Sequence, residues 1–374
     1  MAGKGKKILI SINTSWNIYN FRRNLIMNFL DHGMKVYACA PKDEFSHKLI
    51  SLGIEFNDIK ISQKGTNALD DFNLLLSYKR IIKDIRPDIC LFYTIKPNIY
   101  GSLASESENV PFINNISGLG TVFLRNRPSS HIAKILYKRA LKKSSNVFFQ
   151  NQDDLNLFIE TGIIKHDRTE VLPGSGIDID YFKPTDVYVY RENFTFLMVS
   201  RLIFDKGIRE YIKAARIVRN KFPNVKFDIL GQTEEKGNLG YTKSEIIQIS
   251  DENNIEWHPA KEDVRPYMAQ ADVIVLPSYR EGMSRALLEA LSMEKAILTT
   301  NVPGCRELVN KNQNGLLCKA KDADDLAQKM IELIEMPIEK VKQMGKNGRL
   351  FVKKSFAEEL IFKAYNNAIA DKLS

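Results

Sequence analysis

The chain has 374 residues, and its 54 Lys and Arg against 45 Asp and Glu give a formal net charge of +9. At about 100–200 residues per domain, this length predicts two domains. A composition of 44% hydrophobic and 26% charged residues is globular, which excludes a disordered or fibrous chain. The positive balance favours acidic partners: phosphorylated small molecules, nucleic acid or an anionic membrane surface.

Apolar runs and cysteines exclude further classes. The longest strictly apolar runs, 36–40 and 89–93, are five residues long, too short for a membrane-spanning helix of about 20 residues. The apolar stretch after the basic start is also too short for a signal peptide. Four cysteines without C-x-x-C spacing argue against a disulfide framework or a zinc site. We therefore expect a soluble, cytoplasmic protein.

The first half of the chain alternates apolar, β-branched runs with helical patterns. The predicted strands are 7–12, 35–40, 88–93, 111–115 and 146–149, and the predicted helices are 20–32, 70–85, 129–141 and 153–161. This alternation is typical of a doubly wound α/β sheet, because a right-handed crossover places a helix between parallel strands.

The alternation breaks at 172–191, which is rich in Gly and Pro, and then resumes. The later predicted strands are 194–200, 226–230, 272–277 and 296–299, and the stretch 338–373 is predicted to be helical. We therefore predict an N-terminal domain of residues 1–184 and a C-terminal domain of residues 185–374. In such sheets ligands bind at the carboxyl ends of strands, so we expect a site in the loops that follow the strands.

A first candidate site follows the predicted strand 194–200. Arg201 and Lys206 lie in the loop before a helix that is predicted to start near Gly207. Arg binds phosphate oxygens bidentately and Lys adds a compact point charge, so the loop favours a phosphorylated ligand. The alternative is an exposed basic loop without function.

A second candidate site, residues 281–285, follows the predicted strand 272–277. Gly282 allows close approach of the backbone, and the amides of the next three residues lie at a helix N-terminus, which is a natural anion site. Glu281 precedes this site and Glu289 lies about two turns along the helix. Carboxylates beside an anion site suit sugar hydroxyls, so the pattern suggests a nucleotide sugar. Alternatively, Glu281 is a loop charge and Glu289 a solvated helix residue.

Together, Arg201…Lys206-Gly207 and Glu281-Gly-Met-Ser-(x)4-Glu289 resemble the paired signature of GT-B fold glycosyltransferases, in particular the retaining, metal-independent family 4. The resemblance covers essentially the whole chain. It implies two Rossmann-like doubly wound domains facing across a cleft, with C-terminal helices. It also implies a UDP-sugar as donor substrate and no cofactor.

The same resemblance implies the role of each site residue. Arg201 and Lys206 bind the donor diphosphate, Glu289 holds the ribose hydroxyls, and Glu281 contacts the transferred sugar. The implied catalytic residues are Glu281, Arg201 and Lys206, with no metal ligand. The implied donor-binding residues are Arg201, Lys206, Lys261, Glu281, Gly282, Met283, Ser284 and Glu289.

The N-terminal half departs from the family pattern in two loops. The loop after the first predicted strand lacks the glycines of many relatives, so Asn13 or Thr14 is expected to contact the donor by its side chain. No His follows the predicted strand 111–115. Asn115, Ser117 and Gly118 are the candidate contacts there, and a tight turn that requires glycine is the alternative.

Five segments (21–26, 41–45, 117–123, 148–155 and 172–182) are similar to the branch that extends polyprenyl-diphosphate-linked sugars in bacterial glycan assembly. This implies transfer of a hexose or N-acetylhexosamine, with GalNAc the first candidate, to a lipid-linked sugar. Two alternatives stay open. One is a UDP-sugar epimerase of the same fold, and the other is a non-catalytic nucleotide-sugar-binding module.

Residues 125–143 are basic and amphipathic. This pattern favours peripheral contact with an anionic membrane, at the inner face of the cytoplasmic membrane, and the alternative is a helix that packs on the sheet. Nucleic-acid binding is not expected, because the basic residues are dispersed and no recognised motif occurs.

Overall fold

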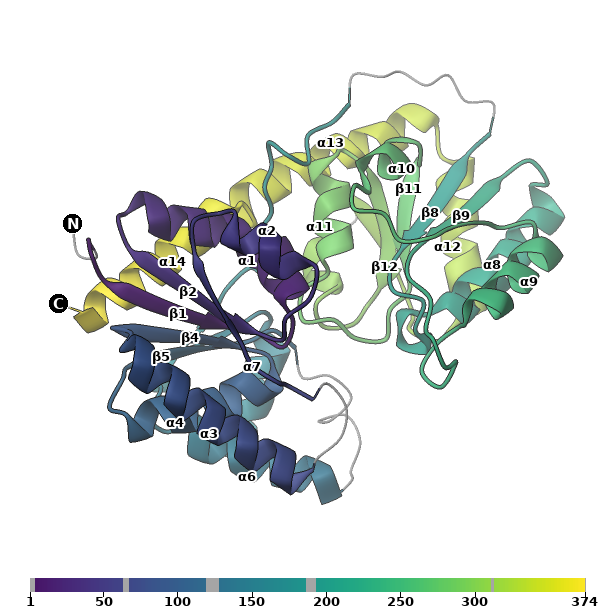
Figure 1. Cartoon of the computed structure of the whole chain (residues 1–374). Coiled ribbons are helices and arrows are strands. Elements are labelled where there is room, and N and C mark those ends of the chain that lie inside the picture. Colours follow the sequence, from purple (N-terminus) through teal and green to yellow (C-terminus); the bar gives the residue numbers. More distant parts are fainter. Residues whose placement is uncertain (1–3, 63–66, 119–127, 186–192, 311–312, 374) are drawn as a thin grey trace. The chain divides into compact units, whose positions relative to one another are not determined.

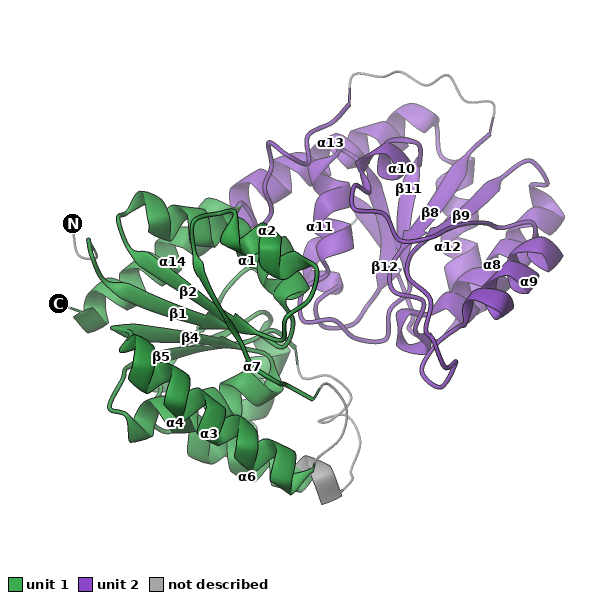
Figure 2. Cartoon of the chain, in the orientation of Figure 1, with its two compact units in different colours: residues 1–176, 358–374 green, residues 177–357 purple. Residues whose placement is uncertain are grey.

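The computed structural model describes residues 4–62, 67–118, 128–185, 193–310 and 313–373. It divides into two compact units (Figure 2). Unit 1 contains Met1–Gly176 and Glu358–Ser374, and unit 2 contains Ile177–Ala357. Among the described residues, no helix is both long and apolar enough to cross a membrane.

Unit 1 is built on a seven-stranded parallel sheet with the order β3-β2-β1-β4-β5-β6-β7 (Figure 1). The strands are β1 Lys7–Ser11, β2 Lys35–Ala40, β3 Glu55–Asp58, β4 Ile89–Tyr93, β5 Phe112–Ile116, β6 Asn146–Phe149 and β7 Thr169–Val171. The central strand β4 is buried at all five positions, as expected where helices cover both faces of a parallel sheet.

Helices cover both faces of this sheet. On one face, α1, α2 and α14 pack against Ile8 and Ile10 of β1. On the other face, α3 and α4 pack against Leu9 and Phe92, while α6 and α7 pack against β6. Side chains alternate along a strand, so one strand serves both layers. The helices are α1 Ser15–Asp31, α2 Phe45–Ile50, α3 Ala68–Ile85, η1 Pro97–Gly101, α4 Ser102–Ser107, α6 Pro128–Leu141, α7 Gln152–Glu160, η2 His166–Arg168 and α14 Glu358–Leu373.

Unit 2 repeats this architecture with a six-stranded parallel sheet of order β10-β9-β8-β11-β12-β13. The strands are β8 Thr195–Val199, β9 Lys226–Leu230, β10 Glu256–His258, β11 Val273–Leu276, β12 Ala296–Thr300 and β13 Gly315–Cys318. The helices are η3 Phe204–Lys206, α8 Ile208–Lys221, α9 Lys243–Asn253, α10 Arg265–Ala269, α11 Arg285–Ser292, η4 Arg306–Leu308, α12 Ala323–Glu335 and α13 Ile338–Ser355.

The doubly wound α/β fold predicted from the sequence is confirmed for both units. In each sheet the strand order reverses direction once: between β1 and β4 in unit 1, and between β8 and β11 in unit 2. Ligands of open α/β sheets bind outside the carboxyl ends of the strands at such a switch point. The loops after these four strands are therefore the positions at which to look for a site.

The units differ from the predicted domains 1–184 and 185–374. They divide at Gly176 and Ile177, and the last helix, α14, belongs to unit 1 rather than to the C-terminal domain. Ile361, Tyr365 and Ile369 of α14 are buried in the core that includes β1 and β4. Their spacing of four forms an apolar stripe, but a stripe does not say which sheet it covers. The helical pattern was therefore right and its assignment to a domain was wrong.

Candidate functional site

The two sequence patterns of the C-terminal half meet at the switch point of unit 2. Strands β8 and β11 are hydrogen-bonded neighbours, so the loops that follow them leave the same edge of the sheet. The loop after β8 ends in the short helix η3, and Gly207 then caps the start of α8 with a left-handed backbone. The loop after β11 leads through Gly282 to α11, whose N-cap is Ser284.

Lys206 and Glu281 form an ion pair between these two loops. Only 18% of the Lys206 side chain and 13% of the Glu281 side chain are exposed. A pair that is this shielded from water is screened little by salt. The structure therefore brings one cation of the first pattern against one carboxylate of the second.

Tyr279 also joins the same two loops. Its amide donates to the carbonyl oxygen of Asp205 at 2.8 Å, and its hydroxyl lies 2.9 Å from each carboxylate oxygen of Glu210 on α8. Burial raises the pKa of Tyr279, and the hydrogen bond to the Glu210 carboxylate raises it further. The phenol therefore stays protonated at neutral pH and donates to Glu210.

A third loop, after β12, supports the turn that carries Glu281. The Glu281 amide donates to the carbonyl oxygen of Pro303 at 3.0 Å, and the Ser284 amide donates to that of Gly304 at 2.9 Å. The Ser284 amide is therefore occupied, which differs from the expectation that it faces a phosphate. The Ser284 hydroxyl accepts from the Leu287 amide at 3.4 Å, so this side chain caps α11.

Glu289 lies one turn after Arg285 on α11. The two form an ion pair of 3.3 Å, and 14% of the Glu289 side chain is exposed. Burial raises the pKa of Glu289, and the Arg285 guanidinium opposes that rise. Glu289 is thus a shielded carboxylate with one charged neighbour, rather than the solvated helix residue of the alternative interpretation.

Met283 is partly buried against the core of unit 2. Two further predicted donor contacts, Arg201 and Lys261, are exposed. Within the described ranges, no hydrogen bond or ion pair joins either side chain to Lys206 or Glu281. Both lie on loops after strands, Arg201 after β8 and Lys261 after β10. Their role in donor binding stays a prediction.

In unit 1, Asn13 and Thr14 follow β1 at the switch point, as the sequence predicts. Both side chains form hydrogen bonds with Asn17 of helix α1. The Thr14 hydroxyl accepts from the Asn17 amide at 3.1 Å, and the Asn13 side-chain oxygen accepts from the Asn17 side chain at 2.8 Å. Thr94 follows β4 at the same switch point with a left-handed φ of 62°. A left-handed backbone is strained for a β-branched residue, and no sequence pattern around Thr94 predicts it.

Asn115, Ser117 and Gly118 lie at the end of β5. Asn115 is buried and donates to the Tyr365 hydroxyl at 3.1 Å, and the Ser117 hydroxyl donates to the Asn115 side-chain oxygen at 3.0 Å. Gly118 has a φ of 130°, which favours the alternative of a turn that requires glycine. Contact of these three residues with an acceptor stays a prediction.

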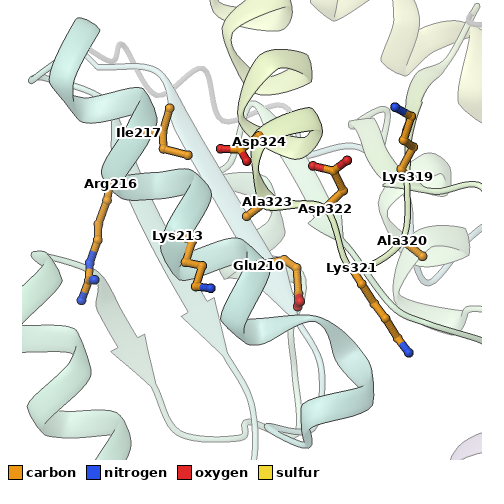
Figure 3. A pocket seen from close by; sticks show the side chains of 10 residues that line it. All are labelled: Glu210, Lys213, Arg216, Ile217, Lys319, Ala320, Lys321, Asp322, Ala323 and Asp324. Atoms are coloured by element: carbon orange, nitrogen blue, oxygen red, sulfur yellow. The ribbon is translucent and has the colours of Figure 1, made fainter.

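A hollow of about 600 Å³ lies on the α8–α12 side of unit 2 (Figure 3). Lys213 and Arg216 of α8 line it, together with Lys321, but so do the acids Asp322 and Asp324 at the start of α12. None of the predicted donor-binding residues lines this hollow. Because acidic and basic side chains both line the hollow, it is poorly suited to a phosphate.

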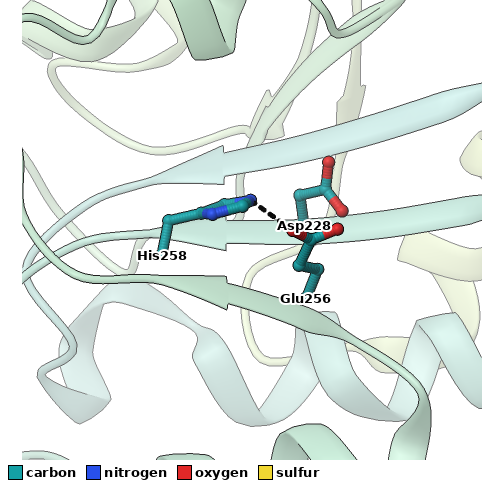
Figure 4. Close-up of side chains that lie close together, drawn as sticks. All are labelled: Asp228, Glu256 and His258. Atoms are coloured by element: carbon teal, nitrogen blue, oxygen red, sulfur yellow. Dashed lines mark ion pairs between the residues drawn. The ribbon is translucent and has the colours of Figure 1, made fainter.

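Asp228, Glu256 and His258 gather on the edge strand β10 and its neighbour β9 (Figure 4). Their potential ligand atoms lie within 4.8 Å of one another, because Glu256 pairs with Asp228 in register and His258 is two residues further on the same face. The His258 ring lies 3.5 Å from Glu256 and also packs on Tyr267. The sequence did not indicate this group, since its members come from two strands.

Two family models match the chain. Residues 186–351 match the model described as glycosyl transferases group 1, and residues 7–151 match the model described as glycosyl transferase 4-like. These segments cover most of both units, and the chain belongs to this family of glycosyltransferases. The resemblance to glycosyltransferases of this group, stated from the site residues, is confirmed, whereas retention and metal-independence stay predictions.

Named relatives agree with this assignment. The chain is 25% identical over 337 residues to the N,N'-diacetylbacillosaminyl-diphospho-undecaprenol α-1,3-N-acetylgalactosaminyltransferase of Campylobacter jejuni, with 85% of this chain and 87% of the relative covered. It is 24% identical over 299 residues to the UDP-Gal:α-D-GlcNAc-diphosphoundecaprenol α-1,3-galactosyltransferase of Escherichia coli, with 76% of each covered.

Solved structures show the same fold. A glycosyltransferase from Rickettsia africae superposes with a TM-score of 0.81 at 19% identity, covering 99% of both chains. Anabaena HepE, solved in complex with UDP and glucose, superposes with a TM-score of 0.81 at 20% identity, covering 98% of this chain and all of that one. The two doubly wound units are those of the GT-B fold.

Proposed function

We propose that this glycosyltransferase moves a hexose or N-acetylhexosamine, with GalNAc the first candidate, from a UDP-sugar to a polyprenyl-diphosphate-linked sugar in bacterial glycan biosynthesis. The anomeric configuration is retained and no metal or cofactor takes part. The observation that carries the donor half of this proposal is the Lys206–Glu281 pair at the switch point of unit 2.

The leaving group is UDP, so negative charge grows on its β-phosphate as the glycosidic bond breaks. Lys206, which its ion pair holds in place, and Arg201 stabilise that charge electrostatically. The β-phosphate takes up the acceptor proton on the same face of the sugar. Glu281 then orients the sugar, because its carboxylate lies beside the cation that binds the phosphate.

The nucleoside is held further along α11. The Glu289 carboxylate accepts hydrogen bonds from the ribose hydroxyls, and Lys261 contributes a main-chain contact to the base. Glu289 suits this role because it is shielded from water and anchored by Arg285, so few side-chain conformations are lost on binding.

The acceptor half of the proposal draws on the relatives. The enzymes from C. jejuni and E. coli are named for acceptors that carry a sugar on diphosphoundecaprenol. An acceptor of this class resides in a bilayer, so the chain works as a peripheral protein at an anionic membrane surface, through the basic segment 125–143. Residues 125–127 of this segment lie outside the described residues, α6 contains residues 128–141, and Lys142 and Lys143 follow it.

A substrate screen tests the proposal. UDP-GalNAc, UDP-GlcNAc, UDP-Gal and UDP-Glc are each incubated with a short-chain polyprenyl-diphosphate sugar, with and without EDTA, and released UDP is measured. We expect release from one donor, dependent on the acceptor and unchanged by EDTA. NMR of the product should show the anomeric configuration of the donor.

Other outcomes point to the alternatives. Release of a free sugar without acceptor supports an epimerase, and UDP-sugar binding without turnover supports a non-catalytic module. Loss of activity in EDTA that is restored by a divalent ion would contradict the metal-independent mechanism, and the Asp228–Glu256–His258 group would then be the first place to look for that ion.

A further inference from the structure

Helix α3 has two apolar stripes, and only one of them is covered. Leu74, Tyr78 and Ile81 pack in the core of unit 1. Leu69 and Phe72, on another face, are 73% and 57% exposed, and Leu76 is exposed as well. These three residues are spaced by three and four, so they form one continuous strip along the first two turns. Core packing does not account for this strip.

Helix α6 shows the same division. Tyr137, Ala140 and Leu141 are buried in the core, whereas Ile132 and Ile135 are exposed, Ile135 to 68%. The segment 128–143 contains five basic residues and no Asp or Glu. The basic residues are Lys134, Lys138, Arg139, Lys142 and Lys143. Arg139 is paired with Glu106 of α4, so the positive charge that follows the exposed apolar side chains of α6 rests on the four lysines.

The two helices present these strips at the same end of one layer. Both pack on η1 and α4, and both lie on the same face of the unit 1 sheet (Figure 1). Each helix precedes the next parallel strand, so each begins at the carboxyl edge of the sheet. Leu69, Phe72, Ile132 and Ile135 all lie in the first turns of their helices.

We propose that this surface, the α3–α6 face, docks the protein on an anionic lipid bilayer. The face consists of Leu69, Phe72, Leu76, Ile132 and Ile135 with the basic residues of 134–143. The apolar side chains enter the interface, and the basic side chains lie against anionic headgroups. The proposal deepens the proposed function, on which it rests for the lipid-linked acceptor, by adding α3 as an apolar contact.

Charge decides between a bilayer and an uncharged apolar partner. A neutral apolar partner would bury the lysines of 134–143 beside its own surface without a negative charge to pair with them, which is costly. An anionic bilayer offers an apolar interior next to a layer of negative charge, so both kinds of side chain are satisfied together. Exposed strips of this kind on two helices that pack on the same elements, η1 and α4, mark an interaction site rather than ordinary surface.

Flotation of the full chain with vesicles tests the proposal. Vesicles of phosphatidylcholine are compared with vesicles that also contain phosphatidylglycerol, at low and high salt. We expect binding to the anionic vesicles only, weakened by salt. The triple variant L69S/F72S/L76S should bind at least about tenfold less. The matched control is L350S, since Leu350 of α13 in unit 2 is 67% exposed; it should bind as the parent does.

Equal vesicle binding by the triple variant and the parent, or no binding of the parent to anionic vesicles, would overturn the proposal. Far-UV circular dichroism and thermal unfolding verify that the variants fold. Turnover of a water-soluble acceptor without vesicles separates this proposal from the proposed function. The triple variant should retain that turnover. A parent that binds vesicles but transfers no sugar would refute the proposed function and leave the docking surface standing.

Discussion

Gly207 lies directly against Pro277. A Cβ atom added to Gly207 would be 2.0 Å from the Pro277 carbonyl oxygen, and the φ of Gly207 is +77°. The start of α8 therefore touches the residue that follows β11, with no room for a side chain. This contact fixes the distance between the loop of Lys206 and the loop of Glu281, so the ion pair between them is a consequence of backbone packing.

Substitution of Gly207 should be costly for two separable reasons. G53A serves as the control, because Gly53 also has a positive φ, +88°, but no atom lies within 4 Å of its Cβ position. We expect G53A to lower the free energy of unfolding by about 1 kcal/mol, from backbone strain alone. G207A should lose at least about 3 kcal/mol, because the clash adds to the strain. Urea denaturation measures both, and equal losses would contradict the packing argument.

Lys206 should be essential for turnover. Replacing it with Ala removes a fixed cation from the leaving phosphate and leaves the Glu281 carboxylate without its partner. We expect turnover to fall about 100- to 1,000-fold, the usual cost of one lost electrostatic contact in an active site. K221A is the control, since Lys221 also forms an ion pair, with Glu335, but on the surface. Near-normal turnover of K206A would remove Lys206 from the proposed mechanism.

Much of the fold could be predicted because its strands are buried. All nine predicted strands are present with ends that differ by at most one residue, since apolar β-branched runs are a local pattern. Strands β3, β7, β10 and β13 were not predicted. They have three or four residues and lie at or near sheet edges, and β3 and β10 mix polar with apolar positions. Their pairing depends on neighbouring strands rather than on their own sequence.

The candidate site likewise has one part that local sequence patterns predict and another part that depends on the fold. Each loop after β8 and β11 has its own local pattern, so Lys206, Glu281 and Glu289 could be proposed from the sequence. Their juxtaposition requires the strand order of unit 2, which no local pattern gives. The carbonyl of Gly304 that occupies the Ser284 amide comes from a third loop, twenty residues further along the chain, and so could not be foreseen.

Tyr279 should matter for donor binding because it joins the two loops that carry Lys206 and Glu281. Y279F removes the hydroxyl that donates to both Glu210 oxygens and leaves the ring in place. A hydrogen bond to a charged group contributes about 1.5–3 kcal/mol. We therefore expect lower stability in urea and weaker UDP binding, as the Lys206 loop becomes less ordered. E210Q retains an acceptor oxygen and should show the smaller effect. Unchanged UDP affinity in Y279F would show that the loops are held by their backbones alone.

Glu289 should make both stability and donor binding depend on pH. Burial raises its pKa above the ordinary value of 4.5, so the folded, ligand-free chain binds this proton more tightly than the unfolded chain does. The contribution of Glu289 to stability is then fully present below pH 4.5 and is lost as the pH rises through the raised value. Ribose hydroxyls donate to the ionised carboxylate and lower its pKa again in the complex. UDP affinity should therefore weaken as the pH falls through the raised value.

Isothermal titration with UDP between pH 5 and 8 measures this dependence, with urea denaturation of the ligand-free chain over the same range. E289Q carries no titratable group, so its UDP affinity should be weaker and flatter with pH. Its stability should also decline less toward high pH, because no buried charge forms. The control is E339Q, since Glu339 forms an exposed ion pair with Lys342 and should leave both profiles unchanged. If E289Q kept the pH dependence of the parent, the ribose contact would belong to another group, because the titrating carboxylate would no longer be present.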